Sequence, residues 1–252
     1  MIVRAVKTDK VLAGQKTIFE ILDEAITELE DSSIVVITSK IISLCENRVI
    51  PIKGSDRDQL VKQESDLYLP RRFSKYNFEL SITKRTLVMS AGIDESNSSG
   101  DFFVLWPKDP QKSAEDIWAH LKKKFNLKDL GVIISDSTCT PLRWGTTGVA
   151  IAYCGFEPKN VYIGQPDLFG RILKVSKSNV AGGLAAAAVV SMGEGAEQTP
   201  LALISDAPFV KFQKQIPSQD ELDNYFISGA EEDVFAPMLN AVEWQKGSQS
   251  KE

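Results

Sequence analysis

Residues 132–152 read VIISDSTCTPLRWGTTGVAIA and join an apolar strand to a second one through a polar loop. Asp136 follows the strand expected over residues 130–134 directly, and Ser137 stands beside it. A carboxylate at the end of a strand, followed by a hydroxyl, is a common way to hold Mg²⁺ near a phosphate. Arg143 in the loop is a cation that could bind a phosphate or carboxylate through two hydrogen bonds. The alternative is a plain hairpin loop with an incidental surface arginine.

The segments on either side predict a mixture of strands and helices. Residues 17–29 carry apolar side chains with a period of 3.6 residues, which indicates an amphipathic helix. Further helices are expected at 40–47, 113–125, 180–192 and 231–242, the last interrupted by Pro237, and within the charged segment 53–80, which otherwise looks irregular. Strands are expected at 1–6, 34–38, 86–89, 102–105, 130–134, 149–153 and 201–205. No clean βαβ repeat appears, so the pattern favours an α+β fold over a doubly wound sheet.

The composition restricts the chemistry. A net charge of −5 argues against a nucleic-acid-binding protein. His120 is the single histidine, which excludes sites that need two. The three cysteines form neither a disulfide framework nor a zinc pattern, so a bound metal should be a hard ion, Mg²⁺ or Mn²⁺. No apolar run approaches the length of about 20 residues that spans a bilayer, so we expect a soluble, cytoplasmic protein without a membrane partner.

A second polar loop, residues 91–100, reads AGIDESNSSG and follows the strand expected over 86–89. Asp94 and Asn97 stand three residues apart, which suits one contact to a metal and one to a nucleotide. The alternative is an Asx-type turn, because Asp, Asn, Ser and Gly favour turns for local reasons.

A third polar loop, residues 192–200, reads MGEGAEQTP and follows the alanine-rich helix. Gly193 and Gly195 flank Glu194, so the backbone could approach a ligand closely while one carboxylate points at it. The alternative is a simple helix C-cap. The chain contains no phosphate-binding GxxxxGK[ST] motif and no complete GxGxxG.

Taken in order, four motifs resemble the coenzyme F420-0:L-glutamate ligase family, which adds γ-linked glutamate to a deazaflavin coenzyme and has a branch assigned to folate. The motifs are GIDESN, ISDSTCTPLRWGTTGVAIA, DLFGR and VAGGLAAAAVVSMGEGAE. The resemblance covers about residues 1–210, and EEDVF at 231–235 is similar to the family's C-terminal helix. We therefore expect a ligase-like domain over 1–210, with 211–252 as a helical segment and polar tail of the same domain.

The resemblance implies an unusual α+β fold, an intertwined homodimer, GTP or ATP as phosphate donor, and two divalent cations, Mg²⁺ or Mn²⁺. Carried over by position, the implied metal ligands are Asp94, Asp136, Ser137 and Glu194. The implied nucleotide contacts are Lys10, Val11, Ser39, Lys40, Asn97, Met192, Gly193, Gly195 and Ala196. Arg143 and Arg171 are expected to orient substrate carboxylates or phosphates during catalysis.

The expected reaction joins L-glutamate to a carboxylate acceptor through an acyl phosphate. Several positions depart from the family's pattern. Leu44 stands in place of a nucleotide-binding lysine, Lys40 replaces a threonine, and Gly182-Gly183 replaces an acidic pair. One arginine is also missing from the loop that ends at Arg143. These changes leave open whether the acceptor is folate-like or a deazaflavin, and leave a non-catalytic nucleotide-binding relative as the alternative.

Overall fold

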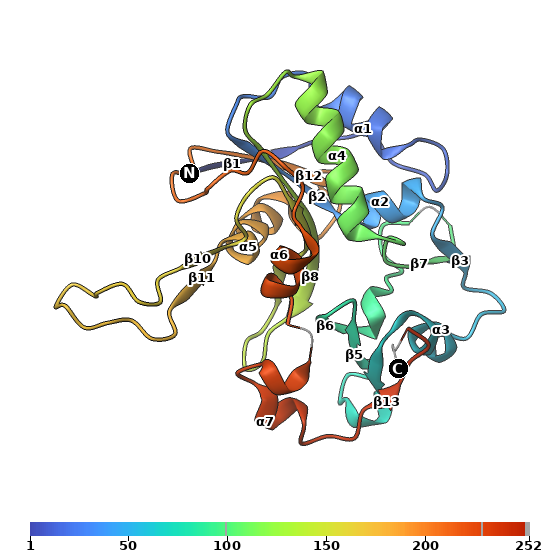
Figure 1. Cartoon of the computed structure of the whole chain (residues 1–252). Coiled ribbons are helices and arrows are strands. Elements are labelled where there is room, and N and C mark those ends of the chain that lie inside the picture. Colours follow the sequence, from blue (N-terminus) through green and yellow to red (C-terminus); the bar gives the residue numbers. More distant parts are fainter. Residues whose placement is uncertain (99, 228, 250–252) are drawn as a thin grey trace.

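The computed structural model describes residues 1–98, 100–227 and 229–249 and is built around a five-stranded sheet (Figure 1). The strands lie in the order β1 (Ile2–Val6), β12 (Leu201–Ser205), β2 (Ser33–Thr38), β8 (Leu130–Cys139) and β9 (Thr146–Cys154). Neighbouring strands are antiparallel except β2 and β8, which run parallel at the centre of the sheet.

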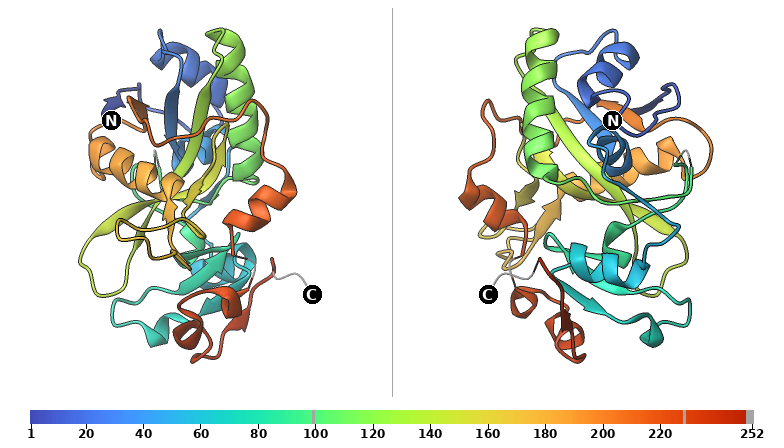
Figure 2. Two further views of the ribbon diagram at one scale, coloured as in Figure 1. Left: turned by 60° about the vertical axis from the view of Figure 1, so that its left-hand side comes forward. Right: turned by 90° about the vertical axis from the view of Figure 1, so that its right-hand side faces the viewer.

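Helices cover both faces of this sheet (Figure 2). Val35 and Ile37 of β2 pack on one face with α1 (Ile18–Ala25), α2 (Ser39–Cys45) and α4 (Pro110–Lys124). Ile34 and Val36 point to the opposite face and pack against α5 (Val180–Met192). The short helix α6 (Gln219–Tyr225) adds Leu222 and Tyr225 to this second core. Because both faces are buried, β2 is apolar along most of its length rather than alternating.

A smaller body lies at one end of the large sheet (Figure 1). Its antiparallel sheet has the order β13 (Gln245–Lys246), β4 (Leu67–Leu69), β5 (Leu80–Thr83) and β6 (Thr86–Met89). Helix α3 (Arg57–Glu64) contacts β4, and β3 (Val49–Pro51) pairs with β7 (Phe102–Val104). The pairing of β13 with β4 brings the C-terminal segment back to a body formed by residues 49–104.

A two-stranded hairpin, β10 (Lys159–Val161) and β11 (Lys177–Asn179), projects as a long arm away from both bodies (Figure 1). Its end exposes large apolar side chains, among them Leu168 at 92% and Phe169 at 85%. The loop between β8 and β9 likewise exposes Trp144 at 92%. Monomeric proteins rarely expose apolar side chains in such clusters. No helix within the described ranges has the length and apolar character needed to cross a membrane.

The structure confirms the mixed α+β class and the strands at residues 86–89 and 201–205 and the helix at 180–192. The first helix ends at Ala25 rather than 29, because Ile26 turns into an extended conformation and inserts into the core. The segment 53–80 holds α3 as expected, but also β4 and the 3₁₀ turn Arg71–Phe73. Residues 250–252 of the expected polar tail lie outside the described residues.

Two predictions of secondary structure are wrong. The single last helix expected at 231–242 is a 3₁₀ turn, Ala230–Glu232, followed by α7 (Ala236–Leu239). Pro237 lies in the first turn of α7, where its missing N–H costs nothing, and it would clash inside a continuous helix. The strand expected to end at residue 134 continues to Cys139, because residues 135–139 pair with β9. Asp136 therefore lies within a strand and not after it.

Candidate functional site

A cavity of about 860 Å³ opens where loops from the large sheet meet the smaller body. This volume lies within the range of pockets that bind small molecules and cofactors. The cavity is lined by all four predicted metal ligands, Asp94, Asp136, Ser137 and Glu194. All nine predicted nucleotide contacts line it as well, namely Lys10, Val11, Ser39, Lys40, Asn97, Met192, Gly193, Gly195 and Ala196.

Asp136 is held at the wall of the cavity by its strand and by a tryptophan. Ile134 pairs with Ala152 and Ser135 with Ala150, so Ile151 is an extra residue that forms a β-bulge in β9. Bulges re-aim the side chains that follow them and are frequent beside active sites. The indole N–H of Trp106 and the backbone N–H of Ser137 both donate to the Asp136 carboxylate. Burial nevertheless raises the pKa of Asp136 to about 6, against these two hydrogen bonds.

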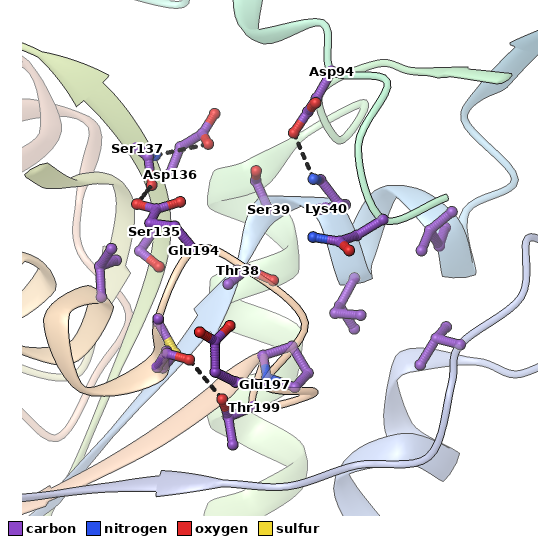
Figure 3. A pocket seen from close by; sticks show the side chains of 18 of the residues that line it. Thr38, Ser39, Lys40, Asp94, Ser135, Asp136, Ser137, Glu194, Glu197 and Thr199 are labelled. Atoms are coloured by element: carbon purple, nitrogen blue, oxygen red, sulfur yellow. Dashed lines mark hydrogen bonds and ion pairs between the residues drawn. The ribbon is translucent and has the colours of Figure 1, made fainter. Parts of the chain in front are cut away.

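Glu194 lies next to Ser137 although 57 residues separate them in the chain. The Ser137 hydroxyl donates to Glu194 Oε1 at 2.6 Å, and the Thr146 hydroxyl donates to the same oxygen at 3.1 Å. Thr146 is the first residue of β9 and pairs with Cys139 across the hairpin. Glu194 and Ser137 thus form one group of oxygen atoms with Asp136, which we call the Asp136 group (Figure 3).

Asp94 has a different environment, on the other side of Ser39 in the view of Figure 3. Its carboxylate pairs with the Lys40 ammonium at 2.5 Å and accepts the Ser96 backbone N–H at 2.8 Å. Burial raises the pKa of Asp94, but the hydrogen bonds from Lys40 and Ser96 outweigh it and hold the pKa below its ordinary value. Asp94 is therefore a carboxylate that already has a cation.

A left-handed turn positions the segment that carries Asp94. Ser90, Ala91 and Gly92 all have positive φ angles of 48°, 56° and 74°. Such a backbone is costly for side chains other than glycine. It is held by the buried carboxylate of Glu79, which accepts the Ser90 hydroxyl at 2.8 Å and pairs with Arg71 at 2.9 Å. The turn is thus fixed by the smaller body and not by the loop itself.

The glycine loop after α5 closes the cavity from a third direction. The Asn97 side-chain amide donates to Gly195 O at 2.9 Å, which joins this loop to the Asp94 loop. The Gly195 N–H donates to the Glu197 carboxylate at 2.8 Å, and the Thr199 hydroxyl donates to Met192 O at 2.6 Å. Gly193 has a φ of 80°, so the helix ends in a conformation that glycine adopts without strain. The structure confirms the helix cap at Gly193 and places the loop on the cavity, while the binding of a ligand by the loop stays a prediction.

The two predicted catalytic arginines do not line the cavity of their own chain. Arg143 is exposed in the loop between β8 and β9, where it donates to Leu142 O at 2.8 Å. Arg171 is exposed in the projecting arm, beyond β10. Within the described residues, no three acidic, cysteine or histidine side chains converge as a ready metal site. The three predicted acidic ligands are divided instead between the Asp136 group and the Asp94–Lys40 pair.

Sequence reasoning missed two side chains that shape the site. Trp106 binds Asp136, and Thr146 binds Glu194. Thr146 could have been found by extending the predicted hairpin, because it lies opposite Cys139 at the end of the ladder. Trp106 carries no sequence signal, because its contact with Asp136 spans 30 residues and depends on the packing of α4 and β8.

Comparison with known proteins identifies the family of the chain. The family model described as F420-0:gamma-glutamyl ligase matches residues 55–206. The coenzyme F420:L-glutamate ligase of Methanococcus maripaludis is 34% identical over 230 residues, covering 82% of this chain and 86% of the relative. The enzyme of the same name from Methanocaldococcus jannaschii is 34% identical over 227 residues, with the same coverage. That of Methanosarcina mazei is 40% identical over 116 residues, or 46% of this chain. The chain belongs to the F420-0:gamma-glutamyl ligase family of enzymes.

Proposed function

We propose that the chain is an amide ligase that joins L-glutamate to a carboxylate acceptor at the expense of a nucleoside triphosphate, with F420-0 as the first acceptor to test. One observation carries this proposal: Glu194 of the glycine loop lies beside Asp136 and Ser137 of β8 in a single cavity. The relatives at 34% identity are named for glutamate ligation to coenzyme F420. A cavity of about 860 Å³ is large enough for a nucleotide and part of a second substrate.

The Asp136 group fits a hard divalent cation. Its donors are two carboxylates and one hydroxyl, and oxygen donors are those that Mg²⁺ and Mn²⁺ prefer. No described residue forms an ion pair with Asp136 or Glu194, so both carboxylates lack a protein cation. When bound, a divalent cation would neutralise the charge of the nucleotide phosphates.

The chemistry that the residues must support follows from the weakness of a carboxylate as an electrophile. In the proposed reaction, the γ-phosphoryl group of GTP or ATP moves to an acceptor carboxylate oxygen, giving an acyl phosphate and the nucleoside diphosphate. The amine of glutamate then attacks the acyl carbon, and phosphate and one proton leave. Lys10 and Lys40 line the cavity and supply positive charge near the phosphates, and Asn97 offers an amide to the nucleotide. No protein nucleophile is needed, since both steps occur between bound substrates.

The acceptor assay tests the proposed function. We expect the full-length protein, with L-glutamate, GTP or ATP and Mn²⁺ or Mg²⁺, to add glutamate to F420-0 and to release inorganic phosphate in equal amount. Mass spectrometry of the acceptor and phosphate release are the two measurements. A parallel reaction with tetrahydrofolate separates the folate-like acceptor from the deazaflavin. Nucleotide binding without phosphate release under any acceptor would favour the non-catalytic relative that Leu44 and Gly182-Gly183 suggest.

The arm and the loop between β8 and β9 support the homodimer that the resemblance implies. Leu168, Phe169 and Val175 in the arm are more than 80% exposed, as are Leu142 and Trp144 in the loop. A second copy of the chain is a partner that would bury these segments together. It would also be the means by which Arg143 and Arg171, which do not line the cavity of their own chain, reach a substrate.

Substitution of the arm tests the dimer. We expect Phe169→Glu to give a monomer in size-exclusion chromatography with light scattering, because a charge buried without a partner is costly at an interface. The matched control is Phe73→Glu, which changes an exposed phenylalanine of the smaller body and should leave the dimer intact. Wild-type protein that runs as a monomer, or a Phe169→Glu protein that stays dimeric, would contradict the arrangement.

A further inference from the structure

The Lys40 ammonium occupies a ready-made cage of oxygen atoms. It lies 2.5 Å from Asp94 Oδ2 and donates to Ser96 O at 3.0 Å and to Ser96 Oγ at 3.1 Å. A lysine ammonium has three N–H donors, and these three acceptors use them all. The Ser96 hydroxyl and N–H bind the same Asp94 carboxylate, so the cage is closed on itself. The arrangement is that of a bound cation with its oxygen ligands.

This ammonium excludes a divalent cation from Asp94. Mg²⁺ binds carboxylate oxygens at about 2.1 Å, and the ammonium nitrogen already stands 2.5 Å from Asp94 Oδ2. A metal on the same oxygen would share its lone pairs with Lys40 and lie within a few ångströms of a like charge. The Lys40 side chain is 24% exposed, and the helix α2 that carries it begins directly after β2, so its backbone is fixed.

The neighbouring acid of the loop also has its own cation, since Glu95 pairs with Arg57 at 3.4 Å. The Asp136 group differs, because among the described residues the donors to Asp136 and Glu194 are neutral: Trp106, Ser137 and Thr146. Of the three carboxylates predicted as metal ligands, one is therefore neutralised by lysine, and two have no ion pair with any described residue. Two carboxylates match the charge of one divalent cation.

We propose that the Lys40 ammonium permanently replaces one of the two divalent cations expected in this cavity, so that each chain binds a single divalent cation at Asp136, Ser137 and Glu194. This inference rests on the proposed function in that it takes the cavity as a site for a nucleotide and a metal. It predicts an enzyme in which one of the charges opposite the phosphates is supplied by the protein and does not depend on metal concentration.

The test counts bound Mn²⁺ directly. Mn²⁺ alone is titrated into the full-length protein, and free Mn²⁺ is followed by its electron paramagnetic resonance signal. We expect one bound Mn²⁺ per wild-type chain and two per chain of Lys40→Met, which keeps the apolar stem and removes the ammonium. The matched control Lys10→Met removes the same charge from another wall of the cavity and should still bind one. The double variant Lys40→Met/Asp94→Asn should again bind one Mn²⁺ per chain.

If Lys40→Met fails to fold, single variants that keep Lys40 still test the inference. Asp94→Asn alone should still bind one Mn²⁺ with affinity within about twofold of wild type, because Asp94 holds Lys40 and not the metal. Asp136→Asn should bind none. Two Mn²⁺ or none on the wild-type chain, or the loss of Mn²⁺ from Asp94→Asn, would overturn the inference. A protein that shows the expected count but joins glutamate to no acceptor would remove the proposed function and leave this inference standing.

Discussion

Replacing Asp136 by asparagine is expected to reduce glutamate ligation by about a thousandfold or more, to the limit of detection. The amide keeps an oxygen that can accept the Trp106 N–H, so the local packing is preserved. It removes the negative charge that a divalent cation needs, and such charge stabilisation is worth several kcal/mol, or about a factor of ten for each 1.4 kcal/mol. The measurement is initial rate of glutamate addition at saturating Mn²⁺, with circular dichroism to show that the fold is retained.

The same substitution should stabilise the metal-free protein. The pKa of Asp136 is raised to about 6 from its ordinary value of 3.8, so its ionised form is disfavoured in the folded state. Below about pH 4 the carboxyl is protonated in both the folded and the unfolded state, so the free energy of unfolding is unaffected. As the pH rises to 6, the carboxyl ionises more easily in the unfolded state, and the free energy of unfolding falls by an amount on the order of 3 kcal/mol. Asparagine cannot ionise and avoids this loss. We therefore expect metal-free Asp136→Asn to melt above wild type at pH 7.5 and level with it near pH 4.

Asp116→Asn is the matched control, because this carboxylate lies on α4 and its side chain is 48% exposed in a pair with Lys112. It should change neither the ligation rate nor the melting temperature beyond experimental error. An Asp136→Asn protein that still adds glutamate in a metal-dependent way would remove Asp136 from the proposed metal site.

Gly155→Ala is expected to lower the free energy of unfolding by about 3 kcal/mol or more, and the melting temperature by roughly 6–12 °C. Gly155 has a φ of 82°, which costs a residue with a Cβ about 1–2 kcal/mol. A Cβ there would also collide with Leu130 O and the Trp118 indole nitrogen. These two atoms form a 2.8 Å hydrogen bond that fastens α4 to β8, so the collision falls on the main core.

Gly164→Ala separates the two contributions. Gly164 has a φ of 85°, close to that of Gly155, but a Cβ there meets nothing within 4 Å. Gly164→Ala should therefore lower the free energy of unfolding by about 1–2 kcal/mol, the cost of the left-handed backbone alone. Thermal or urea unfolding of both variants gives the difference. Equal destabilisation of the two proteins would show that the contact with Trp118 and Leu130 has no energetic weight.

The elements that carry the site could be predicted where sequence pattern and local chemistry agree. The helix at 180–192 has an unbroken small and apolar run and ends at glycine, and its bounds were predicted correctly. The order of the polar loops then indicated that Asp94, Asp136 and Glu194 belong to one site, and the structure places all three on one cavity. The assignment of Asp136 and Glu194 as metal ligands stays a prediction, and we propose that Asp94 binds the Lys40 ammonium in place of a metal.

Other features depend on contacts between distant residues and have no local signal. The Lys40–Asp94 pair spans 54 residues and follows from the packing of α2 against the loop after β6. The extension of β8 to Cys139 depends on a partner strand with a bulge at Ile151, which no period in the sequence marks. The projecting arm contains few residues in regular structure, and its exposed apolar side chains look in sequence like an ordinary core segment.

The parallel pairing of β2 with β8 has a consequence for how the chain reaches its native state. Residues 33–38 must find residues 130–135, which are synthesised only after an intervening segment that contains α4 and most of the smaller body. Contacts so distant in sequence slow folding. Until β8 pairs with it, the apolar strand SIVVIT offers an open edge to other chains, and its other neighbour, β12, lies still later in the chain. Aggregation during refolding should therefore increase with protein concentration, because the open edge of β2 can then meet another chain before it meets β8.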